Sequence, residues 1–259
     1  MAASLKSHSQ GSTLVLTISN LEHRNALGPE LYAAGVEALN VAETNAELRS
    51  VVIVGEGAHF CAGGNLQRLQ GNRQKPPEVQ AQSIDGLHSW IETIRAFPKP
   101  VIAAVEGSCA GAGFSLALAC DFAIAAADAV FVMAYSNVAL SPDGGGTWSL
   151  AQALPRQTVM QLLMLGERIS AERLHQLGLV NAVVEPGRAL ASALTLADRL
   201  NARAPNAMAS IKDLVNEASG AALHTQLKAE RDHFVRNLHH ANAGEGIGAF
   251  LDKRKPTYR

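Results

Sequence analysis

Residues 100–121, with the sequence PVIAAVEGSCAGAGFSLALACD, decide the fold of this chain. Val101–Val105 is a short apolar run rich in β-branched residues and predicts a buried parallel strand, whereas Ala112–Ala119 is small and apolar at helical spacing. Gly111 and Gly113 lie at the turn between them, where backbone can approach a ligand closely and the first N–H groups of a helix are unpaired. Such a turn can hold a developing negative charge, or it can simply let a helix pack closely on a strand.

A second unit of the same kind lies earlier in the chain. Residues 49–54 predict a strand, and the segment GEGAHFCAGGNL that follows ends in Gly63 and Gly64 before a polar helix start. Each turn could offer one backbone N–H to a single oxygen. Acyl-transfer and enolate reactions need that arrangement, because charge builds on a carbonyl oxygen and preorganised donors stabilise it.

Strands alternate with helices along most of the chain. Further strands are predicted at 14–18, 122–126, 130–133 and 180–184, and further helices at 26–39, 84–97, 147–154, 157–165 and 171–177. Residues 71–82 contain two prolines among polar neighbours and predict a mobile surface loop. From residue 187 the pattern is helical, at 187–203, 206–218 and 221–238. We therefore predict an α/β core over residues 1–200 and a C-terminal helical region over residues 201–259.

The composition excludes several classes of protein. The 259 residues carry a formal net charge of -1, which gives no general attraction for nucleic acid or an acidic membrane. The three cysteines, Cys61, Cys109 and Cys120, are an odd number without metal-ligand spacing, so we expect buried free thiols in a reducing compartment and no metal. No secretory leader and no 18-residue apolar span is evident. The expected location is the cytoplasm.

Four motifs occur in order along the chain: HFCAGGNL, KPVIAAVEGSCAGAGFSLALACD, AYSNVALSPDGGGTW and EGIGAFLDKRKP. Together they resemble the crotonase (enoyl-CoA hydratase/isomerase) family over nearly the whole length. The resemblance implies an α/β fold built as a spiral of ββα units, with C-terminal helices that form a homotrimer, often a dimer of trimers. It also implies an acyl-CoA thioester as substrate, in fatty-acid or aromatic-acid catabolism, with coenzyme A as part of the substrate and no cofactor.

The resemblance also assigns site residues. The backbone N–H groups of Gly64 and Ala112 would form the oxyanion hole that binds the thioester carbonyl. The segments that contact coenzyme A in the family correspond here to Arg24, Ala26, Ala62, Phe250 and Lys253. Asn65 replaces the aspartate that usually follows the first turn, and its amide can still cap the next helix.

The chain departs from the hydratase pattern at its two glutamates, whose positions are taken by Ser115 and Tyr135. Neither residue can act as a carboxylate base, so hydration by paired acids does not follow. The remaining carboxylate is Asp143 in SPDGGGT, although a turn aspartate often only bonds its own backbone. Its segment resembles that of the ring-1,2-epoxyphenylacetyl-CoA isomerase branch and of related Δ3,Δ2-enoyl-CoA isomerases. We therefore expect an isomerase that acts through a thioester enolate, with Asp143 as proton carrier.

Three other functions stay open. Enoyl-CoA hydration, a lyase reaction, is the first. His88 and Asp143 also fall where the 4-chlorobenzoyl-CoA dehalogenase branch has its water-activating histidine and nucleophilic aspartate, with Tyr135 at an aromatic position, so a hydrolase or dehalogenase that forms an aspartyl ester is the second. The simpler interpretation of His88 is a polar residue at the edge of a helix. A protein that only binds acyl-CoA is the third.

Overall fold

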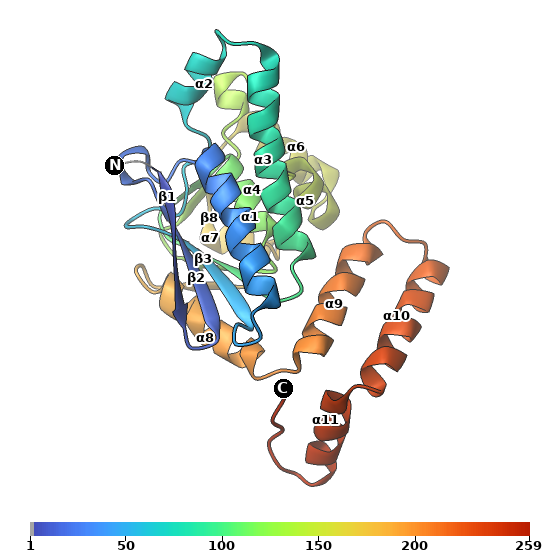
Figure 1. Cartoon of the computed structure of the whole chain (residues 1–259). Coiled ribbons are helices and arrows are strands. Elements are labelled where there is room, and N and C mark those ends of the chain that lie inside the picture. The colour runs from blue at the N-terminus through green and yellow to red at the C-terminus, as the bar shows by residue number, and fades with distance from the viewer. Residues whose placement is uncertain (1–2) are drawn as a thin grey trace.

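A twisted parallel sheet forms the centre of the computed structural model, which describes residues 3–259 (Figure 1). The strands are β1 (Ser4–Gln10), β2 (Thr13–Ser19), β3 (Ser50–Gly55), β4 (Val101–Val105), β5 (Ser108–Ala110), β6 (Phe122–Ala126), β7 (Val130–Val132), β8 (Ile169–Ser170) and β9 (Ala182–Val184). The larger sheet has the order β1-β2-β3-β4-β6-β9, and a smaller sheet has the order β5-β7-β8. In the larger sheet β1 pairs antiparallel with β2, and the other pairs are parallel.

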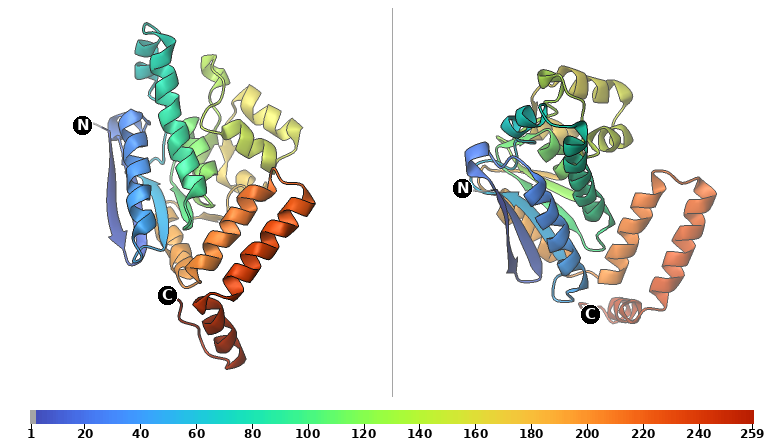
Figure 2. Two further views of the ribbon diagram at one scale, coloured as in Figure 1. Left: turned by 45° about the vertical axis from the view of Figure 1, so that its right-hand side comes forward. Right: turned by 45° about the horizontal axis from the view of Figure 1, so that its top comes forward.

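Helices cover both faces of this sheet. The α-helices of the described residues are α1 (Pro29–Thr44), α2 (Leu66–Asn72), α3 (Pro77–Ala96), α4 (Ala112–Ala119), α5 (Gly146–Ala153), α6 (Arg156–Leu165), α7 (Ala171–Gln176), α8 (Ala189–Asn201), α9 (Pro205–Ala218), α10 (Leu223–Leu238) and α11 (Ala241–Leu251). The views in Figures 1 and 2 show α1 and α3 on one side of the larger sheet and α8 on the other. None of the described helices is both long enough and apolar enough to span a bilayer.

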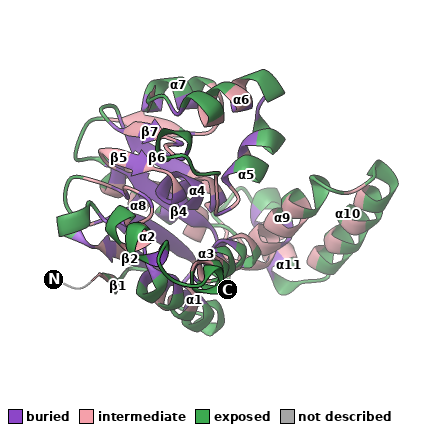
Figure 3. Cartoon of the chain, turned by 90° about the horizontal axis from the view of Figure 1, so that it is seen from above, coloured by how far each residue is buried: buried purple, intermediate pink, exposed green. Residues whose placement is uncertain are grey.

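The run VVIV in β3 is apolar at every position because both faces of the sheet are buried at this strand. Val51 and Ile53 belong to the core cluster that includes side chains of α1 and α3, whereas Val52 and Val54 belong to the cluster beneath α8. The α8 side chains in that second cluster are Ala189, Ala193 and Ala197, which let the helix lie close to the strands. Figure 3 shows the strands as the buried centre of the molecule. An α/β fold of the predicted class is therefore confirmed.

The prediction of a mobile loop over residues 71–82 is wrong. Helix α2 extends to Asn72 and α3 begins at Pro77, so only residues 73–76 separate the two helices. The two prolines on which the loop prediction rests, Pro76 and Pro77, stand at the N-cap and first position of α3. Proline is favoured at the first helical position, because its missing N–H would have no partner within the helix.

Three further elements differ from the predictions at the ends of the chain. Strand β1 was missed because its side chains are nearly all exposed and polar, so it lacks an apolar alternation and is held by pairing with β2. Helix α11 was missed because glycines at 244, 246 and 248 are poor helix formers. Helix α1 begins at Pro29 rather than residue 26, with Gly28 as its N-cap, and continues to Thr44.

Helices α9, α10 and α11 leave the body of the molecule as an arm (Figure 2). Helix α8, which ends at Asn201, still packs on the larger sheet. The boundary placed between residues 200 and 201 stays a prediction.

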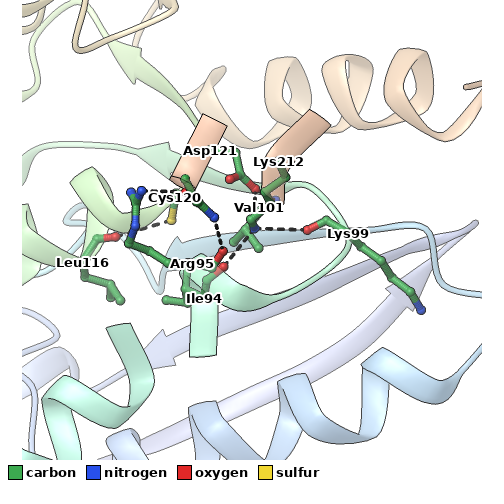
Figure 4. A network of polar contacts seen from close by, with 9 residues as sticks. Ile94, Arg95, Lys99, Val101, Leu116, Cys120, Asp121 and Lys212 are labelled. Atoms are coloured by element: carbon green, nitrogen blue, oxygen red, sulfur yellow. Dashed lines mark hydrogen bonds and ion pairs between the residues drawn. The ribbon is translucent and has the colours of Figure 1, made fainter. Parts of the chain in front are cut away.

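A partly buried ion pair attaches α9 to the core (Figure 4). The Lys212 ammonium group donates to Asp121 Oδ2 at 2.8 Å and to the carbonyl oxygen of Ile94 at 2.9 Å. The same carboxylate oxygen accepts the backbone N–H of Val101, the first residue of β4, at 2.8 Å. Burial raises the pKa of Asp121, and the charge of Lys212 acts in the opposite direction. The lysine therefore offsets the cost of placing this carboxylate inside the protein.

We expect Lys212→Met to lower the free energy of unfolding by about 3–5 kcal/mol, because Asp121 would remain buried without its counter-charge. Denaturant unfolding followed by circular dichroism measures this change. Lys228→Met, at an exposed position of α10, is the matched control and should cost less than about 0.5 kcal/mol. Equal effects of the two substitutions would show that the ion pair does not hold α9 on the core.

Candidate active site

The two glycine turns lie side by side in the structure. The Phe60 N–H donates to the Glu106 carbonyl at 2.8 Å, and the Cys61 N–H donates to the Ser108 carbonyl at 3.0 Å. In return, the Ala110 N–H donates to the Cys61 carbonyl at 2.9 Å. These bonds join the segment after β3 to the segment after β4 in a parallel arrangement.

Two glycines allow the turns to approach this closely. A Cβ atom on Gly63 would lie 2.7 Å from the Ala110 carbonyl oxygen and 3.4 Å from the Ala112 amide nitrogen. A Cβ atom on Gly113 would lie 2.6 Å from both the carbonyl oxygen and the sulfur of Cys61. Any side chain at Gly63 or Gly113 would therefore push the turns apart.

The backbone N–H groups of Gly64 and Ala112 are both free for a ligand. Within residues 3–259, neither group donates to a protein acceptor. Ala112 is the first residue of α4, so its N–H lies at the positive end of the helix. Gly111, which precedes it, has a φ of 49°, a conformation that favours glycine. The convergence of the turns supports an oxyanion hole, and the assignment itself stays a prediction.

Tyr135 connects the Asp143 carboxylate to the second of these turns. The Tyr135 hydroxyl donates to Asp143 Oδ1 at 2.6 Å. A Cβ atom on Gly111 would lie 3.9 Å from the same hydroxyl oxygen, so the phenol borders the turn that leads to the Ala112 amide. Asp143 is half-buried, and its other carboxylate oxygen accepts no hydrogen bond from the described part of the chain. One oxygen is thus held by the phenol while the other can receive a proton.

Tyr135 acts as a hydrogen-bond donor rather than as a base. Burial raises the pKa of its phenol, and the charge and hydrogen bond of Asp143 raise it further. The neutral phenol therefore persists to a higher pH than that of an exposed tyrosine. At this position, a hydratase-type glutamate is replaced by a group that orients the Asp143 carboxylate.

Ser115 fastens the turn that carries Asp143 to helix α4. Its buried hydroxyl donates to the Asp143 carbonyl oxygen at 2.9 Å. A Cβ atom on Gly144 would lie 3.0 Å from Ser115 Cβ, and one on Gly146 would lie 2.7 Å from Ser115 Oγ. The turn therefore fills the space into which a longer side chain at Ser115 would extend. This packing explains why a glutamate at position 115 is incompatible with the observed arrangement.

His88 is not joined to Asp143 in this chain. It is exposed on α3 and lines a surface hollow with Gly144, Gly145 and Trp148 on the outside of the Asp143 turn. The His88 side chain forms no hydrogen bond or ion pair with the described residues. The geometry thus gives the histidine and aspartate pair of a dehalogenase no direct support, and the assignment of His88 stays a prediction.

The residues assigned to coenzyme A fall into two groups. The Ala62 N–H donates to the Arg24 carbonyl at 3.0 Å, which places Arg24, Ala26 and Ala62 beside the first glycine turn. Phe250 and Lys253 belong to α11 and the segment after it, at the opposite end of the molecule from α2 (Figure 1). The Phe250 side chain is 83% exposed. One chain does not bring the two groups together.

Tyr32, Arg68 and Ser83 form a polar cluster that no sequence motif predicts. Arg68 Nη1 donates to Ser83 Oγ at 2.7 Å. Burial raises the pKa of Tyr32 to about 12, an effect that Arg68 opposes and the charge of Asp143 strengthens. The three residues come from α1, α2 and α3, respectively, and no spacing in the sequence relates them to one another. The one signal of this cluster in the sequence is a positively charged residue, Arg68, soon after the first glycine turn.

Cysteine and metal sites add nothing to this chemistry. Cys61 and Cys109 are buried free thiols, and burial raises the pKa of Cys61 to about 12. In the described part of the chain, no three His, Cys, Asp or Glu residues gather in a group that could hold a metal ion. The Cys61 sulfur instead accepts the Gly63 N–H at 3.3 Å and helps to shape the first turn.

Fold and site together define an α/β protein in which two glycine turns with free backbone amides lie near a carboxylate held by a phenol. A family model described as enoyl-CoA hydratase/isomerase matches residues 8–259, and the chain belongs to this family, the crotonases. The family needs no cofactor, and coenzyme A is part of its acyl-CoA substrates.

Relatives within the family carry both of its activities in their names. The 1,2-epoxyphenylacetyl-CoA isomerase of Escherichia coli is 36% identical over 253 residues, covering 97% of each chain. The 2,3-dehydroadipyl-CoA hydratase of the same organism is 32% identical over 250 residues, covering 96% of each chain. A crystal structure described as an enoyl-CoA hydratase from Polaromonas sp. JS666 is 71% identical, covers 98% of this chain and 99% of its own, and has a TM-score of 0.98.

We expect the Tyr135 phenol to stay protonated beyond the usual phenol pKa of 10.0. The measurement is the tyrosinate absorbance of the native protein and of Tyr135→Phe from about pH 9 to 11. The two titrations should coincide, because the missing phenol would not have ionised. A smaller tyrosinate signal in Tyr135→Phe near pH 10 would contradict the expectation.

We expect Ser115→Glu to destabilise the protein by at least about 2 kcal/mol, because the glutamate would displace the Asp143 turn and bury a charge. It should also fail to create hydratase activity. Denaturant unfolding and chromatography of 3-hydroxyacyl-CoA measure the two effects. Thr147→Glu, at an exposed position in α5, is the control and should leave stability nearly unchanged. A stable Ser115→Glu enzyme that gains hydratase activity would refute the packing argument.

Proposed function

We propose that this chain is an acyl-CoA isomerase that shifts a double bond through a thioester enolate. The single observation that carries the proposal is the Asp143 carboxylate, fixed by Tyr135 beside the converged turns of Gly64 and Ala112. The residues at the hydratase glutamate positions, Ser115 and Tyr135, serve to hold Asp143 instead. The similarity to a relative named as an isomerase agrees with this assignment.

The reaction needs one base and one oxyanion hole. The N–H groups of Gly64 and Ala112 bind the thioester oxygen of a β,γ-unsaturated acyl-CoA. The free oxygen of Asp143 removes a proton from the α-carbon, and the electron pair moves to the thioester oxygen as a dienolate. Asp143 then returns the proton to the γ-carbon, and the carbonyl re-forms with the double bond between the α- and β-carbons. The product has the formula of the substrate.

Hydration is the second candidate, because the 71% identical structure is described as an enoyl-CoA hydratase. Addition of water requires a group that activates the water and a group that protonates the α-carbon. Asp143 would have to serve as the sole carboxylate for both steps. Such a hydratase differs from the isomerase in one observable, since its product gains an oxygen atom from solvent.

We also propose that the chain forms a homotrimer, or a dimer of trimers, through a C-terminal region that starts near residue 201. The arm exposes large apolar side chains on α10, a helix that contributes no residue to the buried core. These exposed side chains include Leu223, Leu227, Phe234 and Leu238. In such an assembly, Phe250 and Lys253 of one subunit would complete the coenzyme A site of its neighbour, which a single chain leaves divided.

We expect Asp143→Asn to lower kcat for conversion of trans-3-enoyl-CoA to trans-2-enoyl-CoA by about 10²–10⁴-fold, with little change in KM. The cause is loss of the proton carrier while the oxyanion hole remains. Chromatography of the two isomers measures the rate. Asp128→Asn, at an exposed position after β6, is the matched control and should retain full activity. An Asp143→Asn enzyme with wild-type kcat would contradict the proposal.

The same assay in heavy-oxygen water separates the alternatives. The isomerase predicts an unlabelled 2-enoyl product. Label in a 3-hydroxyacyl-CoA would show a hydratase, and label that appears first in Asp143 would show an aspartyl ester. Acyl-CoA binding without turnover of any substrate in a broad panel would leave a binding protein.

A further inference from the structure

The Arg68 guanidinium is a cation without a carboxylate partner, next to the candidate active site. It extends from the first turn of α2, where its backbone N–H donates to the Asn65 side chain at 3.0 Å. Nη1 donates to the Ser83 hydroxyl, whereas Nε is buried and has no hydrogen-bond partner. No aspartate or glutamate of the described residues forms an ion pair with it.

The two side chains that bond Arg68, those of Ser83 and Tyr32, are polar but uncharged. Tyr32 is 4% exposed and Ser83 is 7% exposed, and both border a groove of about 710 Å³ between α1 and α3. Hydroxyl groups can accept a hydrogen bond from a guanidinium, but they cannot balance its charge. Arg68 is half-buried, so the absence of a counter-charge carries part of the cost it would have in the core, and the buried, unpaired Nε–H adds to this cost. An anion bound at Arg68 would remove both costs.

Arg68 lies on the same side of the molecule as the catalytic carboxylate. Arg68 binds Ser83 on α3, and one helical turn further along α3 the Leu87 side chain would lie 3.3 Å from a Cβ atom on Gly144, the residue after Asp143. Arg68 also lies only four residues after Gly64 of the first glycine turn. A Cβ atom on Gly64 would lie 3.6 Å from the side chain of Leu69, the residue that follows Arg68. The guanidinium is thus close to the space beyond the thioester, where the acyl chain would run.

We infer that Arg68 binds a carboxylate at the far end of the acyl chain, so that the preferred substrates are acyl-CoA thioesters of dicarboxylic acids. The inference rests on the proposed function, because that function places the acyl chain next to Asp143. A guanidinium and a carboxylate form short, charge-assisted hydrogen bonds, and Nε is a donor in that geometry. An alkyl chain would leave Nε unpaired and exclude water from it. Arg68 is therefore a specificity-determining residue.

Matched substrate pairs test this inference. Each pair consists of a trans-3-enoyl-CoA and the trans-3-enedioyl mono-CoA of equal length, with six, eight or ten carbons, which differ only in a terminal methyl or carboxylate. For at least one length, wild-type kcat/KM should favour the carboxylate by about 10–100-fold, the size expected for hydrogen bonds between charged groups. Arg68→Met should abolish this preference and retain turnover of the methyl-ended substrate, whereas Arg68→Lys should keep part of it.

Controls separate failure of the inference from failure of the proposed function. Arg73→Met, which removes an exposed cation just after α2, should keep the preference. Equal use of both substrates at every length by the wild type would overturn the inference and leave the isomerase proposal intact. Loss of both substrates in a folded Arg68→Met protein would also overturn it, because Arg68 would then act in the reaction itself.

If no substrate is isomerised, binding affinities measured by titration calorimetry test whether Arg68 recognises a terminal carboxylate. The saturated acyl-CoA and its ω-carboxyl counterpart are titrated into the wild type, Arg68→Met and Arg68→Lys. Tighter binding of the ω-carboxyl ligand by the wild type, lost in Arg68→Met and partly kept in Arg68→Lys, would support the inference even though the isomerase proposal had failed. Equal affinities in the wild type would overturn it.

Discussion

The close contact between two backbone turns is the constraint on which the rest of this structure depends. At Gly63 and Gly113 a single added carbon would lie 2.6–2.7 Å from a neighbouring carbonyl oxygen, which is shorter than an allowed van der Waals contact. Glycine at both positions lets two parallel strands end with their turns against each other. The turns that carry the free amides of Gly64 and Ala112 are thereby held against each other, with a Cβ atom on Gly63 only 3.4 Å from the Ala112 nitrogen.

Helix α4 connects this pair of amides to the acid. Its first residue, Ala112, supplies one amide, and one turn later Ser115 binds the Asp143 carbonyl. Tyr135 connects the same two regions from the other side, since it borders Gly111 and holds the Asp143 carboxylate. The position of the Asp143 carboxylate relative to the two glycine turns is therefore set by one short, mostly buried helix. A change of chemistry within this fold requires repacking of that helix, as Ser115 in place of a glutamate illustrates.

Much of the fold could be predicted because it follows from local patterns. The strand Val101–Val105 and the helix Ala112–Ala119 agree with β4 and α4 in both bounds, since a β-branched run and a small apolar run differ clearly. Strand β1 has no apolar face, and the glycines of α11 oppose a helix, so tertiary pairing and packing decide both elements. Pro76 and Pro77 were misread because proline begins helices as well as breaking them.

The candidate site was predictable only in part. The motifs supplied Gly64, Ala112 and Asp143, but the hydrogen bonds between the turns join residues far apart in sequence. Tyr32 and Arg68 were not found at all, because they meet from separate helices and neither is part of a motif. Local patterns describe elements well, whereas a site assembled from several elements depends on their packing.

Isotope-edited infrared spectroscopy of a bound acyl-CoA with ¹³C at the thioester carbonyl tests the central claim most directly. If the amides of Gly64 and Ala112 both donate to that oxygen, the carbonyl bond weakens, and its stretching band moves to lower wavenumber than in water. A band at the same or higher wavenumber than in water would contradict the account, because the turns would then not bind the thioester oxygen together.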